Sequence, residues 1–159
     1  MNNAVLFSKA SDEWATPQGL VDALSMEFRF TRDVAATASN RKCVRWFGPG
    51  SPDAEDALTV PWLGCCWMNP PYSRCREFIA KAYAEMMAGH ALTVALVPSR
   101  TDTRWWHDYV WDERVHQTRP GVSIRFLRGR VKFDGAAAGA PFPSMLIVFH
   151  LMWEDEATP

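Results

Sequence analysis

A continuous apolar run at residues 92–97, Leu-Thr-Val-Ala-Leu-Val, constrains the fold of this chain more than any other segment. Its content of β-branched residues predicts a strand, and its lack of polar alternation predicts that both faces of this strand are buried. A strand buried on both faces lies inside a sheet that has other elements packed on each side. The run therefore predicts an α/β protein.

The rest of the chain alternates between apolar residues at helical spacing and short β-rich segments. The expected helices cover residues 17–28, 73–89 and 102–110, the third capped by Thr101 or Asp102. The expected strands cover 30–36, 65–68, 92–97, 123–133 and 145–152, with 123–133 in two pieces broken near Gly129. Residues 43–47 could form a further strand before a turn-rich stretch. Strands separated by helices predict a largely parallel sheet with helices on both faces. The last two strands have no helix between them, which predicts a C-terminal antiparallel pair.

Length and composition indicate one soluble globular domain spanning residues 1–159. Of the 159 residues 48% are hydrophobic and 22% charged, and there is no internal repeat or linker. The chain has no apolar run of roughly 18–20 residues that could cross a bilayer, and no basic region before an apolar stretch at Met1. We expect no membrane partner and a cytoplasmic location.

The cysteines do not have the spacing of a metal site. They are Cys43, Cys65, Cys66 and Cys75. Zinc ligands usually occur in pairs two to four residues apart, and adjacent residues of a strand point to opposite faces. We therefore expect buried, reduced thiols and no metal.

The charge of the chain is unevenly distributed. The net charge is −1, yet one stretch holds five cations and no acid: Arg119, Arg125, Arg128, Arg130 and Lys132. Phosphate binding needs such a local basic face, whatever the total charge. On charge alone, a phosphate-binding face and an ordinary solvated face are equally good interpretations.

The sharpest motif is Asn69-Pro70-Pro71-Tyr72, between a predicted buried strand and a predicted helix. This position is the carboxyl edge of the sheet, where α/β proteins bind ligands. Each proline fixes its own backbone and restricts the residue before it, so Asn69 is held extended and presents its amide at a rigid corner. The alternative interpretation is a rigid proline turn beside an aromatic residue.

Such a corner suits chemistry at a planar nitrogen. An aromatic exocyclic amine is a poor nucleophile because its lone pair is delocalised into the ring. Two acceptors, the Asn69 side-chain oxygen and the Pro70 carbonyl, would grip its two N–H bonds and free the lone pair. Tyr72 would stack on a base that has been pulled out of the duplex. Catalysis would then rest on positioning and electrostatics.

Six ordered segments, spread from about Asp12 to Phe149, resemble the phage-type DNA N6-adenine methyltransferases, which are often grouped with Dam. They are residues 12–17, 30–37, 67–72, 98–107, 128–133 and 140–144. The resemblance implies a Rossmann-like fold and transfer of a methyl group from S-adenosylmethionine to N6 of a flipped adenine in double-stranded DNA. It also implies a phage or prophage origin, with action in the bacterial host.

The same resemblance implies the cofactor contacts. Trp14, Thr16 and Pro17 correspond to an N-terminal cofactor segment in which Thr16 contacts the methionine carboxylate. A helix N-terminus attracts a carboxylate, and Thr16 also suits an ordinary helix cap. Asp33 and Ala35 occupy the place of the glycine-rich loop, although no Gly-x-Gly is present. Asp33 would bind the cofactor's ammonium or, alternatively, cap a turn.

The adenine end of the cofactor is implied to lie at a second acidic segment. Asp56 and Leu58 correspond to the segment whose acid binds the cofactor's adenine amine. Asp53 or Glu55 could take this role instead.

The candidate DNA contacts lie after the buried strand and in the basic stretch. They are Arg100, Arg104, Arg128, Arg130 and Lys132. Arg100 and Arg104 would position DNA or brace the active-site loop, and the loop 134–143 is a candidate for base contacts. The chain has no room for a separate recognition domain, and a homodimer would enlarge the DNA surface.

Two other functions are compatible with the same sequence features. Asn-Pro-Pro-Tyr also occurs in methyltransferases that act on a protein glutamine or an RNA amine. A catalytically inactive DNA-binding protein on the same fold is the second rival, and the missing glycine-rich loop is its best support.

Overall fold

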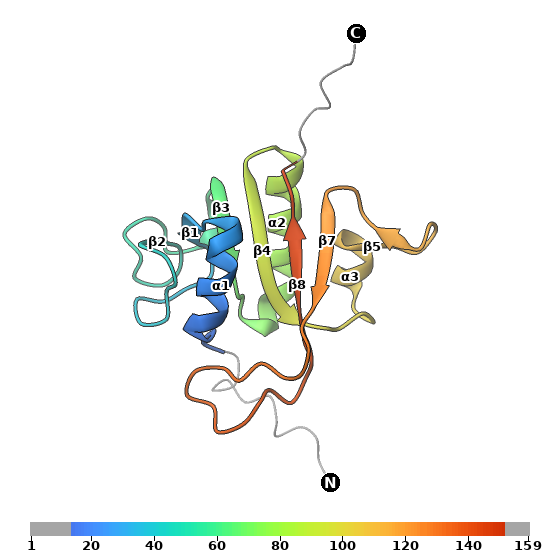
Figure 1. Ribbon diagram of the computed structural model, residues 1–159. Coiled ribbons are helices and arrows are strands. Elements are labelled where there is room, and N and C mark those ends of the chain that lie inside the picture. The colour runs from blue at the N-terminus through green and yellow to red at the C-terminus, as the bar shows by residue number, and fades with distance from the viewer. Residues whose placement is uncertain (1–13, 152–159) are drawn as a thin grey trace.

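The computed structural model describes residues 14–151, which form a six-stranded sheet flanked by helices and a separate two-stranded hairpin (Figure 1). The elements are α1 (Gln18–Phe28), β1 (Arg32–Asp33), β2 (Arg45–Trp46), the 3-10 helix η3 (Ala57–Thr59), β3 (Gly64–Met68), the 3-10 helix η4 (Tyr72–Arg74), α2 (Cys75–Met87), β4 (Ala91–Pro98), α3 (Arg104–Tyr109), β5 (Trp111–Asp112), β6 (Gln117–Thr118), β7 (Val122–Phe126) and β8 (Ser144–Phe149). Two parts of the predictions lie outside the described residues: Asp12–Glu13 and the end of the last strand at Met152.

The sheet has the strand order β2-β1-β3-β4-β8-β7. The four strands from β2 to β4 are parallel, whereas β8 runs antiparallel to both of its neighbours, β4 and β7. The predicted α/β class, the mostly parallel sheet and the C-terminal antiparallel pair are therefore confirmed. Because β7 and β4 are both antiparallel to β8, they point the same way, and both end at the edge where β3 ends.

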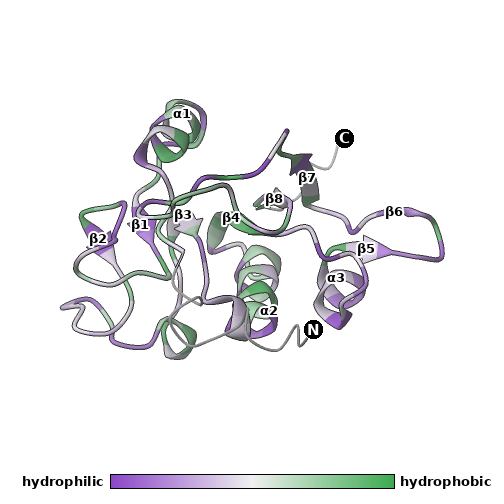
Figure 2. Cartoon of the chain, turned by 90° about the horizontal axis from the view of Figure 1, so that it is seen from below, coloured by the Kyte–Doolittle hydropathy of each residue, from purple (hydrophilic) through white to green (hydrophobic). Residues whose placement is uncertain are grey.

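Strand β4 is buried on both faces, as its apolar run predicts. Val94 and Leu96 belong to a core with Val21 and Leu24 of α1. Ala95 and Val97 belong to a second core, together with residues of α2 and α3 such as Ile79 and Trp105. Figure 2 shows α1 on one side of the sheet and α2 and α3 on the other. The prediction of helices on both faces is confirmed.

The first helix begins differently from the prediction. Pro17 is the residue before the first helical position, Gln18, and no side chain caps the helix. The Thr16 hydroxyl instead accepts a hydrogen bond from Asn69, 53 residues away. The assignment of Thr16 as a helix cap is therefore wrong, because a tertiary partner takes the oxygen that a cap would use. Thr101 and Asp102 do not cap the third helix either, because it begins at Arg104 after an N-cap at Thr103.

Two predicted strands are too long. The segment 30–36 contributes only the two-residue β1, because the Asp33 carboxylate accepts the N–H of Ala35 and turns the chain. The segment 123–133 leaves the sheet after Phe126. From 127 to 143 the chain forms an irregular loop in which Gly129 has a φ of +76°. The break at Gly129 was expected, but the second strand piece after it does not form.

The four cysteines are free thiols. Cys66 and Cys75 are buried, as predicted, whereas Cys43 and Cys65 are half-buried. Burial raises the pKa of the Cys65 thiol to about 11. Within residues 14–151, no helix is both long and apolar enough to cross a membrane.

Candidate active site

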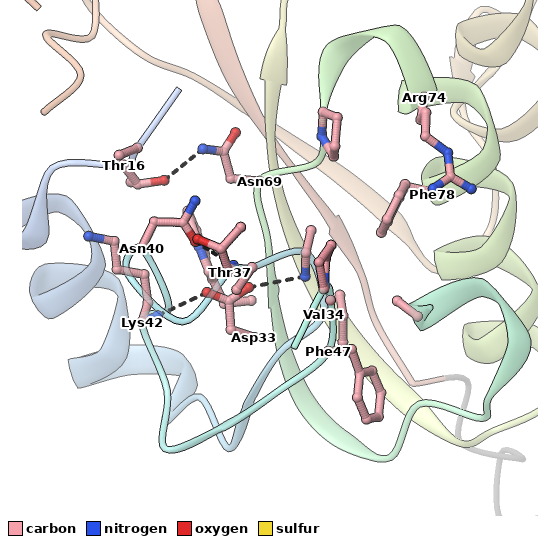
Figure 3. A pocket seen from close by; sticks show the side chains of 18 of the residues that line it. Thr16, Asp33, Val34, Thr37, Asn40, Lys42, Phe47, Asn69, Arg74 and Phe78 are labelled. Atoms are coloured by element: carbon pink, nitrogen blue, oxygen red, sulfur yellow. Dashed lines mark hydrogen bonds between the residues drawn. The ribbon is translucent and has the colours of Figure 1, made fainter. Parts of the chain in front are cut away.

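Asn69 is the first residue after β3, and its side-chain amide is fixed in one orientation. Its Nδ2 donates hydrogen bonds to the Trp14 carbonyl and to Thr16 Oγ1, the latter at 3.0 Å. Figure 3 shows the amide turned toward Thr16. Its Oδ1 is buried and has no hydrogen-bond partner among residues 14–151. An unpaired buried acceptor is costly, so this oxygen is available for an incoming donor.

A pocket of about 320 Å³ lies beside Asn69, a volume within the range of small-molecule sites. Its walls come from the segment before α1, the loops after β1 and β2, the end of β3 and the start of α2 (Figure 3). Seven of the predicted site residues line it: Trp14, Thr16, Asp33, Ala35, Asp56, Asn69 and Pro71. Four others do not line it: Pro17, Leu58, Pro70 and Tyr72. The structure thus brings together segments that the sequence placed 55 residues apart.

Asp33 organises the loop that stands in place of a glycine-rich loop. Its carboxylate accepts the N–H groups of Ala35, at 3.1 Å, and of Lys42, at 2.9 Å. The side chain is 2% exposed, and this burial raises its pKa to about 6. The turn-capping role is confirmed. Contact with a cofactor ammonium stays a prediction, and the place of Asp33 in the pocket wall is compatible with it.

The acidic segment before η3 supplies two pocket carboxylates. Asp56 and Glu55 are exposed and line the pocket, and Asp56 accepts the N–H of Leu58 at 3.0 Å. Asp53 does not line the pocket, and its carboxylate is 3.3 Å from the Arg45 guanidinium. Of the three acids considered from the sequence for the adenine end of the cofactor, Asp53 is therefore the one that does not line the pocket.

Sequence reasoning missed several residues of the pocket wall. They are Thr37, Asn40, Lys42, Phe47, Arg74 and Phe78. The Lys42 side chain is only 9% exposed, and its ammonium lies 3.7 Å from Asp134. The one sequence signal for this group was the polar turn at 37–40 directly after a predicted strand. Lys42 and Phe47 carried no such signal.

An aromatic cluster encloses the other side of the Asn-Pro-Pro-Tyr loop. The Phe142 ring lies 5.4 Å from that of Tyr72 and 5.6 Å from that of Trp14, nearly perpendicular to both. The Tyr72 hydroxyl is buried without a hydrogen-bond partner in the described part of the chain, and burial raises its pKa far above the usual range. Phe142 belongs to the loop 127–143, which is joined to the pocket wall by a hydrogen bond from Asp134 N–H to the Ala15 carbonyl at 2.8 Å.

The basic stretch divides into two groups. Arg119 donates to the His107 carbonyl, and Arg125 forms a pair of hydrogen bonds with Glu27 at 2.6 and 2.7 Å. Both cations thus have partners within the fold, so for them the structure favours an ordinary solvated face over a phosphate-binding face. The predicted DNA contacts are all exposed: Arg100, Arg104, Arg128, Arg130 and Lys132. They follow the ends of β4 and β7, on the same edge of the sheet as Asn69 (Figure 1).

Comparison with known proteins identifies the family. A sequence model described as DNA N-6-adenine-methyltransferase (Dam) matches residues 4–157. The chain belongs to this family. The prediction from the sequence is confirmed, and the family is one of adenine-specific DNA methyltransferases.

Two phage proteins are similar to this Dam-family chain. A DNA N-6-adenine-methyltransferase of Haemophilus phage HP1 (strain HP1c1) is 31% identical over 152 residues, which cover 89% of this chain and 82% of that protein. A DNA N-6-adenine-methyltransferase of Escherichia phage T1 is 28% identical over 99 residues, covering 60% of this chain and 39% of the phage T1 protein. The alignment therefore spans well under half of the phage T1 relative.

Gly48 shapes the pocket wall, and its replacement should be more damaging than that of a neighbouring glycine. A Cβ at Gly48 would lie 1.8 Å from the Ala36 carbonyl oxygen, and its φ is +146°. Gly50 has a φ of +81° but open space around it. We expect Gly50→Ala to lower the free energy of unfolding by about 1–2 kcal/mol and Gly48→Ala to lower it by more. Chemical denaturation of both variants measures this difference; equal losses would contradict the assigned close approach.

Proposed function

We propose that this chain transfers a methyl group from S-adenosylmethionine to the exocyclic N6 of adenine in double-stranded DNA, with the base held at Asn69-Pro70-Pro71-Tyr72. The observation that carries the proposal is the buried Oδ1 of Asn69, a pocket-lining residue, which has no hydrogen-bond partner among residues 14–151. Membership of the Dam family supports adenine as the base. We also assign the sheet to the Rossmann-like methyltransferase fold.

The pocket residues fit S-adenosylmethionine. This cofactor carries an ammonium, a carboxylate and an adenosine, and when bound it supplies an electrophilic methyl group on a sulfonium sulfur. Asp33 would hold the ammonium, and Thr16 would hold the carboxylate near the start of α1. Asp56, or alternatively Glu55, would accept from the amine of the cofactor's adenine. The pocket lining carries three acids, Asp33, Glu55 and Asp56, and also the two cations Lys42 and Arg74. Such a mixed lining suits a ligand that carries both an ammonium and a carboxylate.

The chain's own groups prepare the adenine amine for attack. One N–H of the amine would donate to Asn69 Oδ1 and the other to the Pro70 carbonyl. These two bonds favour a tetrahedral nitrogen and localise its lone pair. The bound cofactor would supply the methyl group and leave as a thioether, and the methylated nitrogen would release one of its two original protons to solvent. Tyr72 would stack on the base, which Pro70 and Pro71 position by fixing the backbone.

The DNA surface is proposed to be the edge of the sheet that surrounds the Asn-Pro-Pro-Tyr loop. Arg128, Arg130 and Lys132 lie on the loop 127–143, and Arg100 and Arg104 flank the start of α3. Recognition within these 159 residues would rest on such loops in a single domain, and a homodimer would double the surface. The phage origin of both relatives supports action on DNA in the cytoplasm of a bacterial host.

A pocket is present although the glycine-rich loop is missing, and this supports an active enzyme over an inactive protein. The loop 33–37 that replaces it lines the pocket and is held by the hydrogen bonds of Asp33. The rival substrates, protein glutamine and RNA amines, would use the same grip on nitrogen. The Dam family match favours DNA over both, and the exposed cations favour a nucleic acid over a protein.

Asn69→Ala should abolish methyl transfer while lowering cofactor affinity far less. The substitution removes the acceptor proposed for the reacting amine, and loss of such a group lowers kcat by about 100-fold or more. Turnover is measured in parallel on unmodified DNA, on RNA and on a release factor, which is the protein substrate of the rival glutamine methyltransferases. Cofactor affinity is measured by calorimetry. Wild-type turnover in the variant would contradict the role of Asn69. Methylation of protein alone by the wild type would refute the proposed substrate.

Cofactor affinity should rise with pH through the titration of Asp33. Burial raises the pKa of this carboxyl to about 6, so the group is mostly protonated at pH 5 and mostly charged at pH 7. Only the charged form attracts an ammonium, so S-adenosylmethionine should bind up to about tenfold more weakly at pH 5. Calorimetry across this range tests the prediction. Asp33→Asn should bind weakly and with a flat pH dependence, and a flat profile in the wild type would contradict the ammonium contact.

Arg130→Ala should weaken DNA binding and reduce its dependence on salt. Each phosphate contact that is lost lowers the slope of log affinity against log salt by about one. Arg114→Ala is a matched control, because Arg114 is 85% exposed but pairs with Asp112 on the β5–β6 hairpin, outside the proposed DNA surface. Titration of each variant with labelled duplex DNA at several salt concentrations gives its salt slope, which should fall for Arg130→Ala and stay unchanged for Arg114→Ala. An unchanged slope for Arg130→Ala would exclude this residue from the phosphate contacts.

A further inference from the structure

The side chain of Asn69 has two different ends, and only one of them can serve the proposed reaction. The oxygen end accepts from an amine, whereas the nitrogen end would direct its own N–H groups at the N–H groups of the substrate. The two ends have nearly the same shape, so the asparagine by itself does not select between them. Something else in the chain has to hold the amide with its oxygen toward the substrate.

Two acceptors from one segment make that selection. The Trp14 carbonyl and Thr16 Oγ1 both receive hydrogen bonds from Asn69 Nδ2, which uses both of its N–H groups. If the amide were turned over, Oδ1 would face the Trp14 carbonyl oxygen, and two acceptors would oppose each other. The same pair of bonds leaves Oδ1 without a partner in the described residues. The donor end is therefore bound to the protein, and the acceptor end is left for the substrate.

The segment that supplies these acceptors is itself fixed. Its Ala15 carbonyl accepts the N–H of Asp134, and the Trp14 ring packs 5.2 Å from Phe133. Thr16 is 2% exposed, so water does not compete for its oxygen. Because Thr16 and Trp14 also line the pocket, one short segment forms both the pocket wall and the support of the Asn69 amide.

We infer that Thr16 is a positioning residue that orients the Asn69 amide, in addition to any contact with a cofactor. Its oxygen accepts from Asn69, and its single hydroxyl proton stays available for a ligand in the pocket. The inference rests on the proposed function, because the orientation of the amide matters for catalysis only if Asn69 Oδ1 accepts from a substrate amine. It implies that the site selects a substrate that donates N–H bonds, as an amino group does, over one that presents a carbonyl oxygen at the same place.

Thr16→Val tests the inference, with Thr16→Ser as its matched control. Valine keeps the shape of threonine but has no acceptor, whereas serine keeps the hydroxyl. We expect kcat to fall about three- to tenfold in Thr16→Val, the factor that corresponds to one neutral hydrogen bond, with KM for DNA unchanged. Thr16→Ser should recover most of the loss. An unaltered kcat in Thr16→Val would overturn the inference, and so would a loss that serine does not recover.

The side-chain NH2 signals of Asn69 give a readout that does not depend on turnover. In a ¹⁵N–¹H spectrum they are assigned by their absence in Asn69→Ala. In the wild type both protons should exchange slowly with solvent, and in Thr16→Val the proton that faced the hydroxyl should shift and exchange faster. Fast exchange of both protons in the wild type would overturn the inference even if Thr16→Val does not fold. A wild type that transfers no methyl group but shows the protected NH2 would instead refute the proposed function and leave the amide orientation standing.

Discussion

Burial of β3 and β4 on both faces is the constraint on which the site depends. Trp67 packs into the core that contains α1, and its neighbour Met68 packs into the core that contains α2. The strand is therefore held rigidly up to its last residue. Asn69 is the first side chain beyond it, and Pro70 and Pro71 prevent the chain from continuing as a strand. A polar amide thus emerges from an apolar core at a fixed point, where small displacements of a reacting group would be costly.

The sequence predicted the parts of the site that local patterns determine. The apolar run in β4 and the Asn-Pro-Pro-Tyr loop each follow from neighbouring residues, so the sheet edge and Asn69 could be located in advance. Thr16 shows the limit of such reasoning. Beside Pro17 it has the chemistry of a helix cap, but its oxygen binds Asn69, 53 residues further along. No local pattern reports a partner at that distance, and the same holds for Lys42, which is buried by the fold and carries no motif.

The basic stretch shows a second limit, since counting charges does not say what each charge contacts. Arg125 is close in sequence to Arg128, but it pairs with Glu27 of α1, 98 residues away, and its guanidinium lies 5.0 Å from the Phe28 ring. The chain leaves the sheet after Phe126, and the cations beyond that point are exposed. Within the basic stretch, the partnered cations Arg119 and Arg125 therefore precede the end of β7, and the predicted DNA contacts Arg128, Arg130 and Lys132 follow it.

The loop that stands in place of a glycine-rich loop packs closely against a glycine elsewhere in the chain. A loop after the first strand needs room for close backbone approach, which glycine usually provides within the loop itself. Here the close approach is between Ala36 of the loop and Gly48, which follows β2, and only a residue without a Cβ fits against the Ala36 carbonyl. Asp33 then supplies the hydrogen bonds that hold the loop. This glycine lies outside the loop, in the segment after β2, so a motif defined on consecutive residues could not detect it.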